Sequence, residues 1–366
     1  MKFICDRAPL NEGLQMIIGV VDPRHIKPVL QAVKIVATKE EILLLATDLE
    51  IGMKYRLSGA DVEEPGEIIL PAARVASIVR EMADDKVHFE SDGPNCVIRS
   101  ASNRFRVLGD SSDEFPSLPS YPDGASLEME GVILKEMIRK SYFAAAPEKM
   151  RYALNGVLLV AKEGSSKVDM VATDGRRMVW IKRKANKDAP FTCEVIIPTK
   201  GALQIERMIK DIEVIQVRVQ ERNIFARTAS AELVAQLVEG QFPNFRAVVP
   251  EDLDKKVDLS AANFAASVRR AALVSDNDEA KAVKIELEPG RMVLTSASSR
   301  GGESRVEIAV EYAGDQAHIT LNPDFLEQAL KTLGDVGVKL ELRDSVTAAI
   351  IRDGSDYLYL TMPITD

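Results

Sequence analysis

The arrangement of apolar and polar positions repeats six times along the chain, each time as a short apolar strand followed by an amphipathic helix. In the copy that begins at Cys193, the run Val195–Ile197 indicates a short buried strand, and apolar side chains then recur at helical spacing from Leu203 to Ile209. Pro198 fits the first turn of this helix. The copies begin at Lys2, Gly66, Ala125, Cys193, Lys255 and Ala317. They predict helices within residues 5–19, 72–82, 131–141, 199–211, 260–272 and 323–333.

Two or three strand-like runs follow each predicted helix. Ile215, Val217 and Val219, for example, alternate with polar residues, and this period of two is typical of a strand with one buried face. Turn signals such as Asp92-Gly93-Pro94 separate the runs. A sheet of this kind needs its apolar face covered, so we expect helices on one side and solvent on the other.

The six copies pair into three longer repeats. The segment ATDLE (46–50) recurs as ATDGR (172–176), and EFPSLP (114–119) recurs as QFPNFR (241–246), at offsets of 126 and 127 residues. The third repeat is less faithful, with LTSASS (294–299) and the closing TMPI (361–364) in the matching places.

This organisation predicts an α+β protein of three domains, 1–124, 125–252 and 253–366, each with two helices on antiparallel sheets of roughly eight strands. The linkers fall near residues 120–126 and 250–256. Three domains joined edge to edge form an arc, which closes most simply by pairing head to tail with a second copy.

Composition restricts the protein class. The 366 residues are 46% hydrophobic and 28% charged, enough for packed cores, but no apolar run approaches the ~20 residues of a membrane helix. We therefore expect a cytoplasmic protein with no membrane contact. Cys5, Cys96 and Cys193 are widely separated and are interpreted as buried apolar side chains. The three histidines lack metal-ligand spacing, so neither a metal centre nor a cofactor is expected.

The charge is unevenly distributed. The net charge of −9 argues against nucleic-acid binding on average, but the six helix windows sum to +4 and leave −13 for the rest of the chain. A solvated surface charge is the simpler interpretation of any single cation, whereas the set predicts a basic helical surface that attracts a DNA backbone. No base-reading or base-stacking pattern is present. The helix-borne cations are Arg74, Arg80, Lys135, Arg139, Lys140, Lys200, Arg207, Lys210, Arg269 and Arg270.

Motifs for catalysis are missing. The sequence has no phosphate-binding glycine loop and no nucleophile elbow. Asp48 and Asp174 each lie in a Thr-Asp turn, where a carboxylate that caps backbone amides is the ordinary interpretation. We therefore expect no enzyme. Two alternatives remain open, an interaction scaffold that does not bind DNA and an enzyme with a dispersed carboxylate site.

Six motifs carry a family resemblance in their order and spacing: LPAAR (70–74), RYALNG (151–156), ATDGRR (172–177), VEGQFPNF (238–245), LNPDFL (321–326) and MPI (362–364). Together with the repeats they closely resemble the bacterial DNA polymerase III beta subunit, the beta sliding clamp, over the full length. The resemblance implies a processivity factor that encircles duplex DNA without sequence preference. It also implies a six-domain ring formed by a head-to-tail homodimer, with the helices lining the hole.

The resemblance also implies a hydrophobic pocket in which partner proteins insert a short peptide. The matching positions of its deeper part are Leu154, Thr173, Gly175, Arg176, Met178, Pro243 and Val248, and those of its shallower part are Asn322, Phe325, Val346, Ala348, Met362, Pro363 and Ile364. For Leu154 and Val346 an ordinary core position is an equally compatible interpretation. The implied partners are the replicative DNA polymerase, the clamp loader, repair and translesion polymerases, and ligase or mismatch-repair proteins. Ala153 replaces an aromatic residue and the end ITD is acidic, so the peptide preference is expected to differ within the family.

The resemblance assigns two further sets of residues. Arg24 matches a DNA-contacting loop position, and we expect it to act with Arg74, Arg80, Lys200, Arg207 and Lys210. The dimer contact is expected to include Phe105 and Val107 on one side and Leu273 and Val274 on the other.

Overall fold

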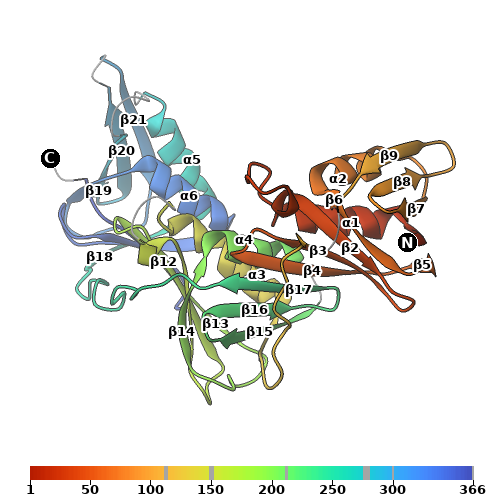
Figure 1. The fold of residues 1–366 in the computed structure, drawn as a ribbon. Coiled ribbons are helices and arrows are strands. Elements are labelled where there is room, and N and C mark those ends of the chain that lie inside the picture. Colours follow the sequence, from red (N-terminus) through yellow and green to blue (C-terminus); the bar gives the residue numbers. More distant parts are fainter. Residues whose placement is uncertain (111–113, 148–151, 211–212, 275–280, 299–300, 365–366) are drawn as a thin grey trace. The chain divides into compact units, whose positions relative to one another are not determined.

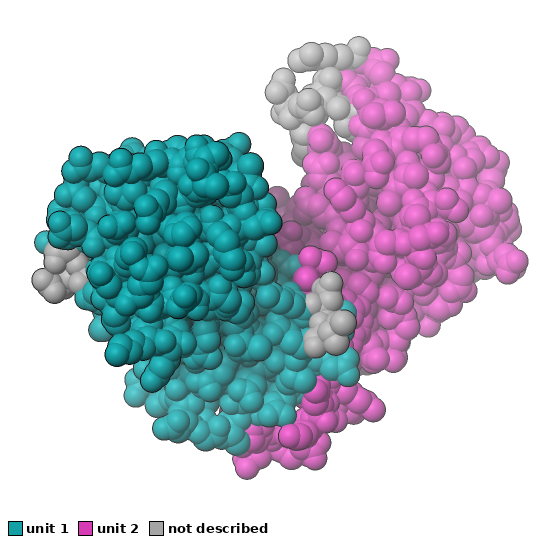
Figure 2. All heavy atoms as spheres, turned by 90° about the vertical axis from the view of Figure 1, so that its right-hand side faces the viewer, with its two compact units in different colours: residues 1–132, 200–237 teal, residues 133–199, 238–366 magenta. Residues whose placement is uncertain are grey.

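The computed structural model describes residues 1–110, 114–147, 152–210, 213–274, 281–298 and 301–364. The chain divides into two compact units, which are coloured separately in Figure 2. Unit 1 contains Met1–Val132 and Lys200–Leu237, and unit 2 contains Ile133–Thr199 and Val238–Asp366.

The described residues contain six α-helices, all within the windows that the sequence predicts (Figure 1). They are α1 (Arg7–Ile18), α2 (Ala72–Glu81), α3 (Gly131–Arg139), α4 (Thr199–Met208), α5 (Ala261–Ala272) and α6 (Pro323–Leu333). Five helices directly follow a strand and α6 begins after one intervening residue, Asn322, which confirms the sixfold strand-helix unit. One detail was wrong: Pro198 is the last residue of its strand, and the helix begins one residue later.

Two antiparallel sheets build unit 1 in its described part. The first has the order β5-β1-β7-β8-β9, with bounds β1 (Lys2–Asp6), β5 (Ala60–Glu64), β7 (Lys86–Asp92), β8 (Asn95–Arg99) and β9 (Arg104–Leu108). The second has the order β10-β15-β16-β17-β4-β3-β2-β6, with bounds β2 (Ala32–Ala37), β3 (Ile42–Thr47), β4 (Ile51–Leu57), β6 (Gly66–Pro71), β10 (Leu127–Glu130), β15 (Val214–Gln220), β16 (Asn223–Arg227) and β17 (Ala231–Gln236).

Unit 2 has the same plan. One sheet has the order β14-β11-β12-β13-β25-β24-β23-β18, with bounds β11 (Gly156–Ala161), β12 (Lys167–Thr173), β13 (Arg177–Lys184), β14 (Cys193–Pro198), β18 (Lys255–Ser260), β23 (Gly337–Leu342), β24 (Ala349–Asp353) and β25 (Tyr357–Thr361). The other has the order β21-β20-β19-β22, with bounds β19 (Val283–Glu288), β20 (Arg291–Ala297), β21 (Glu303–Ala309) and β22 (Ala317–Leu321).

The sequence repeats and the compact units differ because strands pair across the repeat boundaries. In unit 1, β17 of the second repeat pairs with β4 of the first, with Leu233 opposite Met53. In unit 2, β13 pairs with β25, with Trp180 opposite Leu358. Each pairing closes two sheet edges that would otherwise expose unpaired backbone groups. The repeats are therefore joined edge to edge, as the sequence predicts.

The helices pack through the apolar faces that their spacing predicts. Leu10, Leu14 and Ile17 of α1 lie one turn apart and are fully buried. Asn322 caps α6, because its Oδ1 accepts the backbone N–H groups of Asp324 and Phe325. The apolar stripe and the cap of α6 both follow from local sequence.

The cysteines are buried, as expected. Cys5, Cys96 and Cys193 are free thiols with little or no exposure. Desolvation by burial raises the pKa of Cys5 and Cys96 to about 12, which makes these thiols poor nucleophiles at neutral pH.

Candidate functional site

The Thr-Asp turn of unit 2 is a closed network of short-range hydrogen bonds. Thr173 Oγ1 accepts from Gly175 N (3.1 Å) and donates to Arg177 O (2.6 Å). Asp174 Oδ1 accepts from Arg176 N (2.9 Å) and Arg177 N (3.0 Å). The capping interpretation of Asp174 is therefore confirmed, and the turn exposes Gly175 with φ at +88°, where glycine is favoured.

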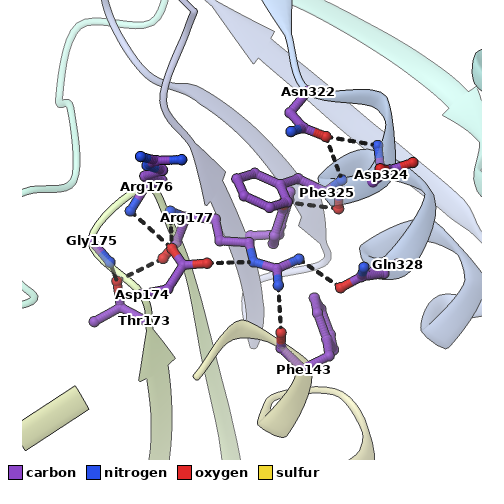
Figure 3. Close-up of polar contacts among 11 residues, drawn as sticks. Phe143, Thr173, Asp174, Gly175, Arg176, Arg177, Asn322, Asp324, Phe325 and Gln328 are labelled. Carbon is purple, nitrogen blue, oxygen red and sulfur yellow. Dashed lines mark hydrogen bonds and ion pairs between the residues drawn. The ribbon is translucent and has the colours of Figure 1, made fainter. Parts of the chain in front are cut away.

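Arg177 links this turn to helix α6 (Figure 3). Its side chain is only 8% exposed. The guanidinium donates from Nε to Asp174 Oδ2 (3.0 Å), from Nη1 to Gln328 Oε1 (2.8 Å) and from Nη2 to the backbone oxygen of Phe143 (2.7 Å). It also lies 4.2 Å from the ring centroid of Phe325, a cation–π contact.

Sequence reasoning did not assign a role to Arg177. The available signal was a cation three residues after the capping aspartate and directly before the apolar run Met178–Ile181. A buried charge is tolerated only when it is paired and hydrogen-bonded. The four contacts satisfy this condition, and they link the Thr-Asp turn to helix α6 and to Phe143.

The backbone of Phe325 is held by a further hydrogen bond. Its backbone oxygen accepts a hydrogen bond from the hydroxyl of Tyr359 (2.9 Å), a fully buried residue of β25. Burial raises the pKa of Tyr359 well above its usual range, so the hydroxyl remains a donor at all ordinary pH values. The partly exposed ring of Phe325 is thus held in position by α6, β25 and Arg177.

The end of the chain lies against the same turn. The backbone N–H of Met362 donates to the oxygen of Arg176 (2.8 Å), and that of Ile364 donates to the oxygen of Thr320 in β22 (2.9 Å). These bonds hold the segment Met362–Ile364 between the Thr-Asp turn and β22, with the side chain of Met362 exposed.

An apolar cluster underlies these groups. Leu154, Met178 and Ala348 are buried in one cluster that also contains Phe242 and Phe245. Leu154 is 4% exposed and is therefore a core residue. It could form only the floor of a pocket.

The three remaining pocket positions lie at the surface. Pro243 is exposed between the buried rings of Phe242 and Phe245. Val346 is 65% exposed in a turn where Asp344 Oδ1 accepts its backbone N–H, so Val346 is not a core residue. Val248 is also exposed. All fourteen positions belong to unit 2.

The candidate DNA-binding residues all belong to unit 1. Arg74 and Arg80 are exposed on α2, Arg207 is exposed on α4 and Arg24 is exposed in the loop after α1. Lys210 is also exposed and forms an ion pair with Glu12 of α1 (2.8 Å).

Lys200 requires a correction. Its Nζ donates to Asp48 Oδ2 and to the backbone oxygen of Val20 (2.9 Å), so it is committed to holding α4 against the end of α1. Gln204, one turn later, adds a hydrogen bond to the backbone oxygen of Met16 (2.7 Å). The sequence could not show this because the residues that pair lie more than 150 positions apart. Lys200 is a packing cation and not a free phosphate ligand.

Other helix-borne cations are likewise neutralised. Lys140 is largely buried, with Nζ 2.8 Å from Glu136 Oε1 and 3.6 Å from Asp353 Oδ2. Arg269 lies 3.0 Å from Glu327 of α6. Fewer helix-borne cations are therefore free of ion pairs than the charge count suggests.

The candidate dimer residues differ in exposure. Leu273 is 77% exposed at the end of α5, and Phe105 is partly exposed on edge strand β9. Val107 is only 1% exposed because its side chain packs into its own sheet, opposite Cys96. The assignment of Val107 therefore needs revision: β9 can offer a partner the backbone edge at Val107 but not the side chain.

Three family models match the chain in succession. They describe the N-terminal domain of the DNA polymerase III beta subunit over residues 1–119, its central domain over 128–244 and its C-terminal domain over 246–365. The chain belongs to this family. The resemblance inferred from the motifs is thereby confirmed, together with the three-domain α+β fold.

Individual relatives agree with this assignment over the whole length. A protein named beta sliding clamp in Chlamydia pneumoniae is 31% identical over 365 residues, which cover 100% of this chain and 99% of the relative. The beta sliding clamp of Pseudomonas putida is 28% identical over 368 residues and all of both chains. The crystal structure of the DNA polymerase III subunit beta from Pseudomonas aeruginosa matches with a TM-score of 0.90, 27% identity and full coverage of both chains. That of the beta subunit from Thermotoga maritima matches with a TM-score of 0.92 and 26% identity, over 100% of this chain and 99% of the other.

As a member of this family, the protein is a DNA sliding clamp, a non-catalytic processivity factor in DNA replication. Ring formation as a homodimer is a property of the family, whose members bind DNA and polymerase partners. No helix in the described ranges is long and apolar enough to cross a membrane.

Proposed function

We propose that partner proteins dock on unit 2 by inserting a short peptide over the apolar cluster beside the chain end. The observation that carries this proposal is the backbone bonding of Met362 and Ile364, which fixes an exposed thioether and two further apolar residues next to the Thr-Asp turn. Thioether and aliphatic side chains form an adaptable socket for a hydrophobic anchor. Exposed Pro243, Val248 and Val346 would supply the rim.

The two parts of the proposed pocket have different character. Met178 and Leu154 offer a closed apolar floor on the side of the Thr-Asp turn. Phe325, Asn322 and the chain end offer a more open side above α6. Arg176 is exposed between them, so an acidic or amide group of the peptide next to its anchor would meet a positive charge.

Deleting Met362–Asp366 is expected to lower the affinity for a fluorescein-labelled clamp-binding peptide by about 100-fold or more. The reason is that roughly 3 kcal/mol of apolar contact is removed. Fluorescence anisotropy measures the affinity, and light scattering checks that the dimer persists. Deleting only residues 365–366 is the matched control and should leave the affinity within about twofold. Unchanged affinity after the longer deletion would refute the placement of the pocket.

We further propose that DNA is retained by topology, with weak backbone contacts from exposed cations of unit 1. Arg24, Arg74 and Arg207 form no ion pair with any residue that the structure describes, so their guanidinium groups are available to phosphates. Arg80 and Lys210 have partners on the surface, whose exposure keeps such pairs weak. Contacts of this kind release counterions and weaken steeply with salt, whereas a closed ring on closed DNA does not dissociate.

Once loaded by a clamp loader onto nicked circular DNA, the protein is expected to stay bound during gel filtration at high salt and to be lost after one cut linearises the circle. Loss from both forms, or retention on both, would contradict encirclement. Retention on the circle alone also excludes a scaffold that does not bind DNA.

Replacing Arg74, Arg80 and Arg207 with alanine should shorten residence on DNA while the dimer persists. Because each phosphate contact contributes about one unit to the salt slope, the slope should fall by about 2 to 3. The matched control removes three exposed cations outside the helices. It replaces Lys39, Arg56 and Lys184 with alanine, and it should behave as wild type.

The homodimer is proposed to form between edge strands β9 and β21. In the described residues both strands have one neighbour in their sheet, so each leaves a row of backbone groups open. The exposed side chains differ in charge: β9 has Arg104 and Arg106, whereas β21 has Glu303 and Glu307 on either side of Arg305, which pairs with Glu307 (2.8 Å). Phe105, Leu273 and Val274 would supply the apolar part of the contact.

The finer assignments follow from the same proposal. The partners are the replicative polymerase, the clamp loader, repair and translesion polymerases, and ligase or mismatch-repair proteins, and the site of action is the cytoplasm. Domain limits of 1–124, 125–252 and 253–366 remain our proposal.

A further inference from the structure

Unit 1 contains a cavity of about 450 Å³, which is within the size range of ligand pockets. Leu30 and Ile69 are buried and form its floor. Proline and aliphatic side chains form the walls of the cavity, and charged side chains form its rim. The full lining is Lys27, Pro28, Val29, Leu30, Leu49, Ile69, Asp110, Glu114 and Pro116. None of these residues has a role in the proposed docking of peptides, in DNA contact or in the dimer.

The cavity lies beside a turn that repeats three hydrogen bonds of the turn in unit 2. Thr47 Oγ1 accepts from Leu49 N (2.9 Å), and Asp48 Oδ1 accepts from Glu50 N (3.0 Å) and Ile51 N (2.7 Å). The equivalent acceptors in unit 2 are Thr173 and Asp174. The interpretation of Asp48 as a capping residue is thereby confirmed.

The remaining walls repeat as well. Asp110 N donates to Ile69 O (3.0 Å) in unit 1, as Val238 N donates to Ile196 O (2.9 Å) in unit 2. Leu30 belongs to a 3-10 helix (Pro28–Gln31) that precedes β2, and Leu154 belongs to one (Tyr152–Leu154) that precedes β11. Pro116 and Pro243 are the prolines of EFPSLP and QFPNFR. The cavity is thus the counterpart, in the first repeat, of the proposed peptide pocket.

Leu49 distinguishes the two copies. It adopts φ of +80°, where unit 2 has Gly175 at +88°. A non-glycine residue in this region is strained, and the side chain of Leu49 is also 50% exposed at the mouth of the cavity. Backbone strain and exposed apolar surface both oppose stability, and strain of this kind is concentrated at ligand-binding positions. Leu49 is therefore placed to contact an apolar ligand.

Charged residues at and beside the rim differ between the two copies. Asp110 and Glu114 line the cavity of unit 1, and Glu50 follows Leu49 in the turn; unit 2 has Val238, Gln241 and Arg176 at the matching positions. These three positions have a net charge of −3 in unit 1 and +1 in unit 2. Lys27 offsets part of the negative charge at the cavity. An apolar socket with an acidic rim selects a ligand that joins an apolar anchor to a cation.

We propose that this cavity is a second peptide-docking site, which takes a short segment of a partner protein with an aliphatic or aromatic anchor next to lysine or arginine. The anchor enters between Leu30, Pro116 and Leu49, and the cation contacts Asp110 and Glu114. The inference rests on the proposed function of unit 2 only through the equivalence of the repeats. The two sites together would let one protomer hold two partners of opposite charge.

The test selects octapeptides from a random displayed library on the full-length protein and measures the enriched peptides by fluorescence anisotropy. We expect a class with an apolar anchor and basic neighbours, with Kd of about 1–100 µM. Deleting Met362–Asp366 should leave this class unaffected while it removes peptides bound to unit 2. If no basic class is enriched, or if the deletion removes it, the proposal is overturned whether or not unit 2 binds peptides.

Two variants locate the site. Leu49→Gly removes the apolar rim and relieves the strain, so affinity for the basic peptides should fall at least about 10-fold with no decrease in Tm. Glu114→Lys should lower the affinity for the basic peptides. It should raise the affinity for a matched peptide in which glutamate replaces the lysine or arginine. A control substitution, Glu40→Lys, introduces the same charge at an exposed turn outside the cavity and should change neither affinity. Unchanged binding in both test variants would overturn the proposal.

Discussion

Replacing Arg177 with alanine is expected to lower the free energy of unfolding by about 3–5 kcal/mol, because a buried ion pair loses one partner and leaves the other uncompensated. Asp174 Oδ2, Gln328 and the backbone oxygen of Phe143 would each lose a donor within 3.0 Å. Denaturant unfolding followed by circular dichroism measures the change.

The same substitution is expected to weaken peptide binding to unit 2, since Phe325 loses the cation at 4.2 Å and the turn loses its link to α6. Arg177→Lys should recover only part of the stability, because an ammonium cannot reproduce the planar fork to three acceptors. Arg183→Ala is the matched control on the same strand. Its pair with Glu136 is partly exposed, so its loss should cost roughly 1 kcal/mol. Equal losses for Arg177→Ala and Arg183→Ala would show that the Arg177 network does not hold the site.

Replacing Leu273 with aspartate is expected to convert the homodimer into monomers at micromolar concentration. The side chain is 77% exposed in the single chain, and a buried unpaired carboxylate in the dimer would cost several kcal/mol, or about a 1000-fold weaker association. Sedimentation velocity and light scattering measure the mass. The variant should also fail to remain on closed circular DNA, because a monomer cannot encircle it.

Ile26→Asp provides the matched control for this experiment. Ile26 is the most exposed large apolar side chain in the described residues and lies outside the proposed dimer contact. Its replacement introduces the same charge without burying it, so the dimer should persist. A Leu273→Asp protein that remained dimeric would refute the proposed contact between protomers.

The sequence by itself determined the elements and their repetition. Hydrophobic periods of 3.6 and 2 depend on neighbouring residues, so the six helices and strands such as β15 (Val214–Gln220) could be predicted directly. The Thr-Asp turns were predictable for the same reason, since Asp48 and Asp174 cap amides only two and three residues away. The order of the motifs then identified the family and hence the function.

The tertiary structure alone decided which side chains are free and which are committed. Lys200 and Arg177 pair with Asp48 and Gln328 across 152 and 151 residues, distances over which no sequence period carries information. The burial of Val107 depends on its sheet register, and the cavity beside Leu49 requires four segments to meet. Edge pairing between β17 and β4 also joins separate repeats. Each of these features results from non-local packing, whose free energy depends on the position of every neighbour and not on the local order of residues.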